Sequence, residues 1–126
     1  MLRSATSGSA RIVLACTPGE RHLLPLDALA AALAQTGTPI CMLGSDVPVT
    51  ALRDALERTR PAAVVLWSHE AQTADLDAVA VGVALADRVY IAGPGWEDVS
   101  IDGVAALPDI ESACEVLAES VQLSAV

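Results

Sequence analysis

The chain has 126 residues, of which 53% are hydrophobic and only 2% aromatic, and its formal net charge is −9 without a single lysine. That length suits one domain with a core of small aliphatic side chains. The acidic balance argues against direct nucleic-acid binding, because phosphate contacts need clustered cations, and the apolar runs are far too short to span a membrane.

Three cysteines, Cys16, Cys41 and Cys114, are widely spaced and form no C-x-x-C pair. This usage is typical of small buried residues in a cytoplasmic protein and predicts neither a disulfide framework nor a metal site. Residues 1–10 lack the apolar stretch of a signal peptide, so we expect a flexible lead-in followed by one domain over residues 11–126.

The first half of the chain alternates between short apolar runs and helix-forming segments. Residues 11–16 form a continuous apolar run, which predicts a strand covered on both faces. A polar turn then leads to an Ala/Leu-rich helix over 23–35 that should end at a glycine. A second strand is expected over 39–43, followed by a helix that Thr50 can cap and Pro61 ends.

The second half repeats this alternation. Its expected elements are a strand over 62–67, a helix over 75–86, a strand over 88–92, a brief strand over 104–107 and a last helix capped by Asp109. The buried face of that helix should carry Ile110, Ala113, Leu117 and Val121.

Strands and helices that alternate with short loops predict an α/β fold, because right-handed crossovers then build a parallel sheet. Five strands in this length favour a flavodoxin-like (Rossmann-like) three-layer sandwich, in which a five-stranded parallel sheet has helices on both faces.

The loops after the first, third and fourth strands meet at the carboxyl edge of such a sheet, where these folds bind ligands. Small and polar residues interrupt the apolar sequence in all three loops. They are Glu20, His22, Ser68, His69, Glu70, Gly93 and Gly95.

Several common chemistries fit these loops poorly. A flavin site needs a Ser/Thr/Gly-rich phosphate cradle and stacking aromatics, whereas the first turn offers one Thr and one Gly. A phosphate-accepting receiver domain needs an acidic pair after the first strand, where Cys16-Thr17 stands, and a lysine, of which there is none. Adjacent Ser68, His69 and Glu70 cannot align as a hydrolase triad. The two histidines also lack a zinc-ligand spacing.

The three loops together resemble the cobalamin-binding (vitamin B12-binding) domain family. Its pattern is D-x-H-x-x-G in the first turn, S-x-L after the third strand and G-G after the fourth. The corresponding segments here are Glu20-Arg21-His22-Leu23-Leu24-Pro25, Ser68-His69-Glu70 and Ala92-Gly93. Their surroundings are similar to the subgroup attached to MerR-type, light-responsive transcription regulators.

The resemblance implies base-off, His-on binding of a corrinoid such as adenosylcobalamin or methylcobalamin. His22 would be the lower axial ligand of the metal, and Glu20 would fix its tautomer. Small residues would leave room for the nucleotide tail of the cofactor; the expected ones are Gly44, Ser68, Gly93 and Gly95.

Glu20 stands where the family has an aspartate, which is a mild change, and three further departures weaken this implication. Pro25 and Ala92 replace glycines of the pattern. Glu70 replaces an apolar leucine and would put a carboxylate beside the tail of the cofactor, where burying an unpaired charge is costly. From the residues alone, His22 could equally be an ordinary histidine of a surface turn, and His69 a solvated loop residue. Trp67 and Trp96 are expected to pack in the core.

The resemblance therefore implies a non-catalytic cobalamin-binding sensor of a transcription-regulator system. Its partners would be the corrinoid and a helical-bundle or DNA-binding domain, with a homo-oligomer also open. A corrinoid-carrier subunit of a mutase or methyltransferase is a further reading. The alternative from another class is a relative that has lost the cofactor and acts as a protein-interaction module.

Overall fold

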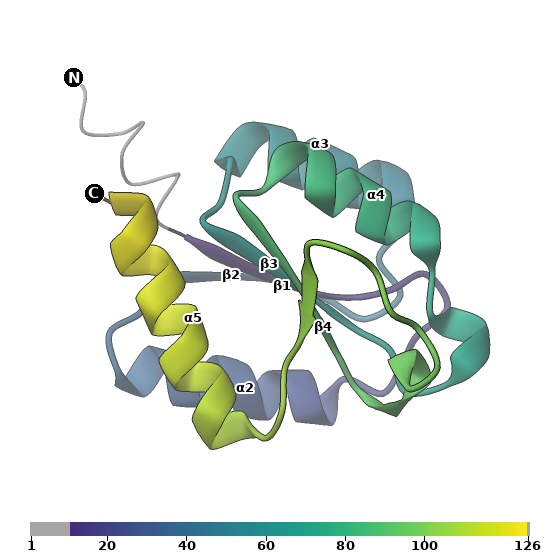
Figure 1. Cartoon of the computed structure of the whole chain (residues 1–126), viewed down its shortest axis with the longest axis horizontal. Helices are drawn as coiled ribbons and strands as arrows, with labels where there is room; N and C mark the ends of the chain where they lie inside the picture. The colour runs from purple at the N-terminus through teal and green to yellow at the C-terminus, as the bar shows by residue number, and fades with distance from the viewer. Residues whose placement is uncertain (1–10, 126) are drawn as a thin grey trace.

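The computed structural model describes residues 11–125, so the expected lead-in over 1–10 lies outside the described residues. A parallel sheet runs through the middle in the strand order β2-β1-β3-β4-β5 (Figure 1). Its strands are β1 (Ile12–Cys16), β2 (Ile40–Gly44), β3 (Ala63–Trp67), β4 (Arg88–Ala92) and β5 (Val104–Ala106). The predicted flavodoxin-like sandwich is confirmed.

Two helices cover each face of the sheet (Figure 1). On one face lie α2 (Leu24–Gln35) and α5 (Ile110–Ala125), and on the other α3 (Val49–Thr59) and α4 (Leu76–Leu85). The loops after β3 and β4 each contain a single 3₁₀ turn, η1 (Ala71–Thr73) and η2 (Pro94–Trp96).

One of the two predicted helix caps is confirmed: the carboxylate of Asp109 accepts a hydrogen bond from the backbone N–H of Ser112 at 2.9 Å. Asp75, at the start of the helix predicted over 75–86, also caps it by accepting from the N–H of Ala78 at 3.0 Å. The cap predicted at Thr50 is wrong, because α3 already begins at Val49, with Pro48 at the N-cap position. Pro48 is extended at φ −62° and ψ 150°, and the helix starts directly after it.

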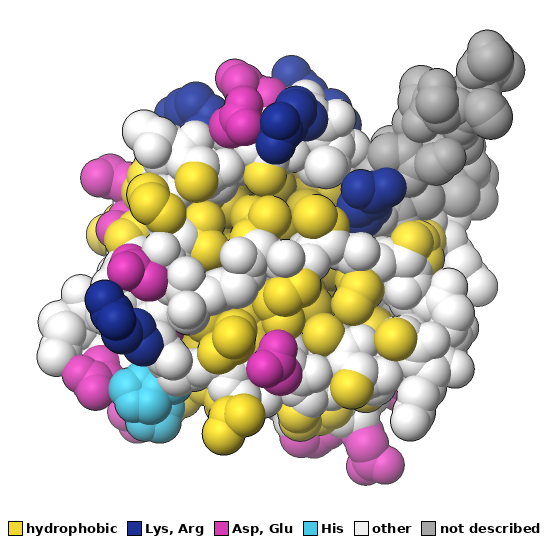
Figure 2. Space-filling model, turned by 180° about the vertical axis from the view of Figure 1, so that it is seen from behind, with side chains coloured by type: hydrophobic (Ala, Val, Ile, Leu, Met, Phe, Trp, Pro, Cys, Tyr) yellow, Lys and Arg dark blue, Asp and Glu magenta, His cyan; other side chains and the backbone are white. Residues whose placement is uncertain are grey.

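The two edges of the sheet differ in length and surroundings. β2 has five residues, all half-buried, whereas β5 has three. Figure 2, seen from behind, shows the face that carries β2 as a band of hydrophobic side chains between the charged surface of α3 and the surface of α2.

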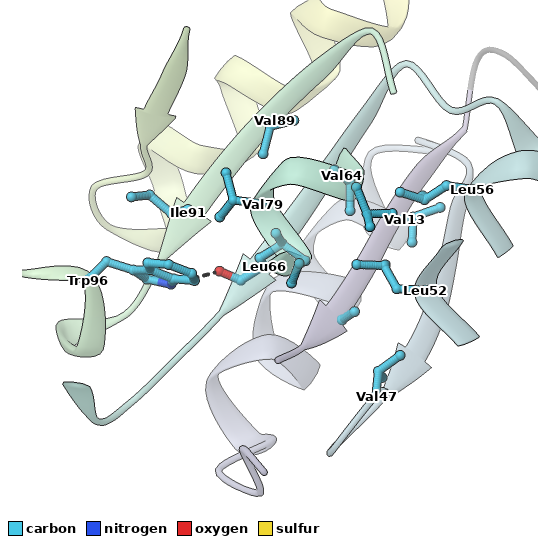
Figure 3. Packing of buried hydrophobic residues seen from close by; sticks show 13 residues of the cluster. Val13, Val47, Leu52, Leu56, Val64, Leu66, Val79, Val89, Ile91 and Trp96 are labelled. Carbon is cyan, nitrogen blue, oxygen red and sulfur yellow. Dashed lines mark hydrogen bonds between the residues drawn. The ribbon is translucent and has the colours of Figure 1, made fainter. Parts of the chain in front are cut away.

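The core divides into two apolar layers, one on each face of the sheet. Alternate strand residues point into each layer, as Val64 and Leu66 do on the α3–α4 face (Figure 3). Trp96 closes one end of this layer, where its indole N–H donates to the carbonyl of Leu66 at 3.1 Å. The prediction that Trp96 belongs to the core is therefore confirmed.

Candidate functional site

The turn after β1 is fastened to the loop after β2. Gly19 adopts φ +82° and donates its N–H to Oδ1 of Asp46 at 2.7 Å. The N–H of Asp46 in turn donates to the carbonyl of Glu20 at 2.8 Å. These reciprocal bonds fix the backbone of the turn and thereby the positions from which the side chains of Glu20 and His22 project.

The carboxylate of Glu20 lies at the centre of a buried polar network, with 1% of the residue exposed. Its Oε2 accepts from the backbone N–H and from Nδ1 of His22, at 2.9 and 2.7 Å. Its Oε1 accepts from the N–H of His69 at 2.6 Å and from the hydroxyl of Thr73 at 2.7 Å. Four donors thus converge on one carboxylate and join the loops after β1 and β3.

These donors keep Glu20 ionised despite its burial. Desolvation by itself raises the pKa of the carboxyl group, but the hydrogen bonds from Thr73, His69 and His22 outweigh it and lower the pKa to about 2. Glu20 is therefore a carboxylate at neutral pH, and it accepts hydrogen bonds without donating any.

An ionised Glu20 determines the tautomer of His22. Because Oε2 can only accept, Nδ1 of the neutral imidazole carries the proton and Nε2 keeps its lone pair. The side chain of His22 is 51% exposed, so the ring is held at one nitrogen on an open part of the surface. A carboxylate-oriented imidazole is the arrangement that proteins use to present a histidine nitrogen to a metal.

The ring of His69 stacks on the ring of His22, with 4.3 Å between ring centroids and 29° between planes. His69 is exposed, as predicted for a loop residue, and its backbone N–H is what binds Glu20. The two histidines, from loops 47 positions apart in the sequence, therefore form one pair at the carboxyl edge of the sheet.

Thr73 is the site residue that the sequence reasoning missed. Its hydroxyl donates to Glu20 and lies 2.8 Å from the hydroxyl of Ser68, which is fully buried. The sequence places Thr73 in the loop after the third strand, but nothing in its neighbours indicates a contact with the first turn. We call Glu20, His22, Ser68, His69 and Thr73 the rim network.

The glycines expected to line a slot occupy different environments. A Cβ on Gly93, which has φ +104°, would lie 2.3 Å from the carbonyl oxygen of Ser68, and one on Gly95 would lie 2.4 Å from its hydroxyl. Gly93 and Gly95 therefore allow the loop after β4 to pack directly against Ser68. Gly44, at the end of β2 with φ +100°, has open space where its Cβ would be.

An apolar cavity of about 200 Å³ lies between the first turns of α2 and α5, beside the ends of β3 and β4. We call it the α2–α5 cavity. Its lining residues are Pro25, Leu26, Leu29, Trp67, Ala92, Leu107, Pro108, Asp109, Ile110 and Ala113. Apart from Ala92 and Ala113, the residues that line this cavity are larger than the glycines and serine that were expected to line the slot for the cofactor's tail.

Two residues of the α2–α5 cavity are only partly covered, although Trp67 packs against the core layer as predicted. Ile110, predicted on the buried face of the last helix, is 41% exposed, since it lies in the first turn of α5 at the edge of the cavity. Trp67 is half-buried, and its indole nitrogen has no hydrogen-bond partner among residues 11–125. A buried N–H without an acceptor costs roughly 1–3 kcal/mol.

A second hollow, of about 450 Å³, adjoins the histidine pair and shares Pro25 with the α2–α5 cavity. Its lining residues are Arg21, His22, Leu23, Leu24, Pro25 and His69. Leu24 is 81% exposed here, the highest value among the large hydrophobic residues identified as exposed. The surface beside His22 is thus concave and largely apolar.

The departure at Glu70 leaves the α2–α5 cavity unaffected. Glu70 is exposed, and its carboxylate accepts a hydrogen bond from the side-chain amide of Gln72 at 2.7 Å. Pro25 and Ala92, by contrast, both stand in the cavity wall. Of the three departures from the family pattern, two therefore narrow the α2–α5 cavity and one lies outside it.

Other chemistry-bearing groups do not extend the site. Burial, followed by the charges of Glu20 and Asp27, raises the pKa of the Cys16 thiol to about 11, which makes it a poor nucleophile. Within residues 11–125, no three His, Cys, Asp or Glu side chains group as metal ligands. In the same part of the chain, none of the helices has the length and apolar character needed to cross a bilayer.

Solved structures with this fold include several corrinoid proteins. A cobalamin-binding protein from Desulfitobacterium hafniense DCB-2 matches over 89% of this chain, with a TM-score of 0.69 and 21% identity. The methanol:cobalamin methyltransferase complex MtaBC from Methanosarcina barkeri matches over 89% of this chain, with a TM-score of 0.72 and 15% identity. The monomethylamine corrinoid protein of the same organism matches over 92% of this chain, with a TM-score of 0.69 and 16% identity. No family model matches the sequence, and neither does any curated protein.

These similarities show that the chain has the fold on which cobalamin-binding proteins are built. The matched region is 59% of the Desulfitobacterium protein, 46% of the MtaBC chain and 61% of the monomethylamine corrinoid protein. All three known chains therefore extend well beyond the part that resembles this protein. At such low identity the match concerns the fold, and the ligand has to be argued from the site itself.

Proposed function

We propose that the chain is a cobalamin-binding module that takes the corrinoid in the base-off, His-on mode, with Nε2 of His22 as the lower axial ligand. The observation that carries this proposal is the Glu20–His22 pair. A buried, ionised carboxylate holds Nδ1–H at 2.7 Å and leaves Nε2 free on an exposed, concave surface.

The residues present fit the two ends of such a cofactor. The hollow beside His22 offers an apolar surface for the flat macrocycle, and the α2–α5 cavity offers an apolar recess for the nucleotide tail. The ring of Trp67 and the side chain of Leu107 are among the apolar groups that would contact the tail there. When bound, the corrinoid would be held through His22 and would supply a cobalt ion able to carry an alkyl group.

The test is a spectroscopic titration of the purified chain with hydroxocobalamin. The protein should retain the corrinoid through desalting, and its absorption spectrum should change from the base-on to the base-off, His-on form. His22→Ala should lose the spectral change, whereas His69→Ala, which removes the adjacent exposed ring, should keep it. A chain that retains no corrinoid, or a His22→Ala spectrum identical to that of the wild type, would refute the proposal.

We further propose that the module is the sensor of a transcription-regulator system of the MerR-type, light-responsive kind. This rests on the segments around the site, above all Pro18-Gly19-Glu20-Arg21-His22 and Gly93-Pro94-Gly95-Trp96. Illumination of the adenosylcobalamin-loaded protein should change its spectrum and its affinity for a helical-bundle partner. A protein loaded with methylcobalamin that, with a partner methyltransferase, transfers its methyl group to a thiolate acceptor and is left as cob(I)alamin would instead identify a corrinoid carrier.

One observation favours a second candidate, a domain that has lost the cofactor and serves as a protein-interaction module. Pro25 and Ala92 both stand in the wall of the α2–α5 cavity, whose volume of about 200 Å³ is below the roughly 300 Å³ at which ordinary ligand pockets begin. This candidate predicts no corrinoid retention by the wild type and none by an Ala92→Gly variant. Retention restored by Ala92→Gly would instead identify a site narrowed by one methyl group.

A further inference from the structure

The outer edge of β2 is apolar and carries none of the charges that usually protect a sheet edge. Its residues Ile40, Cys41, Met42 and Leu43 are all half-buried, and the stretch between Gln35 and Asp46 contains no charged residue. Exposed strand edges normally carry charges or prolines, because unpaired backbone groups invite another strand. Here only Pro39, directly before the strand, has that character.

The backbone groups that face outward can be assigned from the pairing with β1. The N–H of Ile12 donates to the carbonyl of Pro39 at 3.0 Å, so Pro39 faces β1. Because a parallel ladder uses alternate residues of each strand, the N–H and C=O of Ile40 and Met42 point away from β1. The register slips by one residue after Met42, so the regular edge is Ile40–Met42.

Charge distribution distinguishes this edge from the opposite one. In residues 11–60, which form β1, α2, β2 and α3, five arginines balance five acidic residues. In residues 61–126, eleven acidic residues face a single arginine, Arg88, which leaves a net charge of −10. Two copies that met at β5 would bring these acidic halves together, whereas two copies that met at β2 would hold them at opposite ends.

We propose that β2 is the contact surface for a second copy of this chain, in an antiparallel, two-fold symmetric pair. With Cys41 opposite Cys41 of the second copy, each Ile40 faces a Met42, and their outward N–H and C=O groups satisfy one another in four hydrogen bonds. The sheet then continues from one copy into the other. The proposed pairing does not depend on corrinoid binding, because Ile40, Cys41 and Met42 belong neither to the rim network nor to the wall of the α2–α5 cavity.

The proposed register has a consequence for the native cysteine. Residues opposite each other in a non-hydrogen-bonded antiparallel pair have Cα atoms about 4.5 Å apart, which is within the roughly 4.4–6.8 Å that a disulfide spans. Cys41 packs toward the α3–α4 face, and the two-fold axis places both copies of Cys41 on that same face. Cys16 is buried and Cys114 lies on α5, so Cys41 alone should form a link across the pair.

The test compares the mass of the full chain in solution, without corrinoid and in the dark, by light scattering after size exclusion. The wild type should have twice its chain mass of 12.9 kDa. Met42→Lys should halve that mass, because it adds a charge to the regular part of the edge, at a residue paired with Ile40 of the second copy. Ala105→Lys, which adds the same charge on β5, should leave the dimer intact. A thermal melt of each variant establishes that it is folded.

Oxidation with copper phenanthroline gives a second measurement, because the wild type already carries a cysteine on the edge. The wild type and Cys114→Ser should form a disulfide-linked dimer, whereas Cys41→Ser should not. A wild-type chain that stays monomeric, a dimer lost with Ala105→Lys but kept with Met42→Lys, or a link through Cys114 would overturn the proposal. A monomer that dimerises only after removal of residues 1–10 would also overturn it and assign the edge to that segment.

Discussion

The rim network and the α2–α5 cavity lie next to each other, but different interactions hold them. In the rim network, every oxygen of the central carboxylate of Glu20 has two donors. In the cavity, apolar walls enclose space, and the indole N–H of Trp67 has no partner among the described residues. The rim is therefore held in place by hydrogen bonds within the protein, whereas the cavity leaves apolar space that a ligand can fill.

This difference predicts where substitutions act. Changes in the rim network should reduce the stability of the free protein, because buried polar groups lose partners. Changes in the cavity wall should leave stability nearly unchanged and act on the bound state.

Glu20→Gln should have the largest effect. The amide keeps the shape of the side chain but removes its charge, and its NH₂ group would meet two donors instead of accepting from them. We expect a loss of about 3 kcal/mol in the free energy of unfolding, measured by urea denaturation. Glu57→Gln, a charge-matched change on the exposed surface of α3, should lose less than about 0.5 kcal/mol. Equal losses in the two variants would contradict a central role for Glu20.

Acid should weaken the wild type through the same group. The pKa of Glu20 is lowered from 4.5 to about 2 in the folded protein, so its contribution is fully present above about pH 4.5 and disappears as the pH falls toward 2. We expect about 3 kcal/mol to be lost across this window, visible as a falling urea midpoint. The Glu20→Gln variant should show a shallower decline, and an identical decline would assign the acid sensitivity to other carboxyl groups.

Thr73→Val should have an intermediate effect. Valine has nearly the volume of threonine but cannot donate to Glu20 or bond to Ser68, so the carboxylate loses one of its four donors. The expected loss is about 1–2 kcal/mol, with a raised pKa of Glu20. Thr73→Ser, which keeps the hydroxyl, should lose less. If both variants were equally unstable, the methyl group and its packing would be the cause.

Ala92→Gly should have the smallest effect on stability and a clear effect on binding. A glycine in a strand costs roughly 0.5–1 kcal/mol. The change also removes a methyl group from the cavity wall, so corrinoid should bind more tightly if its tail enters there. Binding is measured by the same spectroscopic titration as above. Unchanged affinity in a variant that still binds would place the tail elsewhere.

Sequence patterns predicted the elements well, because each depends on nearby residues. The strand over 88–92 agrees residue by residue with β4, and the predicted cap at Asp109 is a local contact with Ser112, three residues later. The first helix ends before a glycine with φ +76°, as expected for a helix stop. The prediction of a cap at Thr50 was wrong because a helix can also begin directly after Pro48, two residues earlier. The helix-start preferences of the two residues do not decide which of the two positions begins the helix.

The candidate site was predictable only in part. Glu20 and His22 stand two residues apart, so their pairing follows from the first turn alone. The bond from Thr73 to Glu20 joins positions 53 residues apart, and no local signal announces it. The α2–α5 cavity depends on how α2 and α5 pack on the sheet, so a list of small residues near strand ends did not identify its walls.

The α/β sandwich, with a carboxylate and a histidine in its first turn, can be predicted from the sequence because hydrophobic periodicity and turn residues act over short distances. The tertiary structure alone decided that Glu20 is ionised by four converging donors, that His69 stacks on His22, and that Pro25 and Ala92 narrow a cavity while Glu70 lies outside it. Each of these outcomes depends on loops and helices distant in the chain that come together only when the sheet assembles.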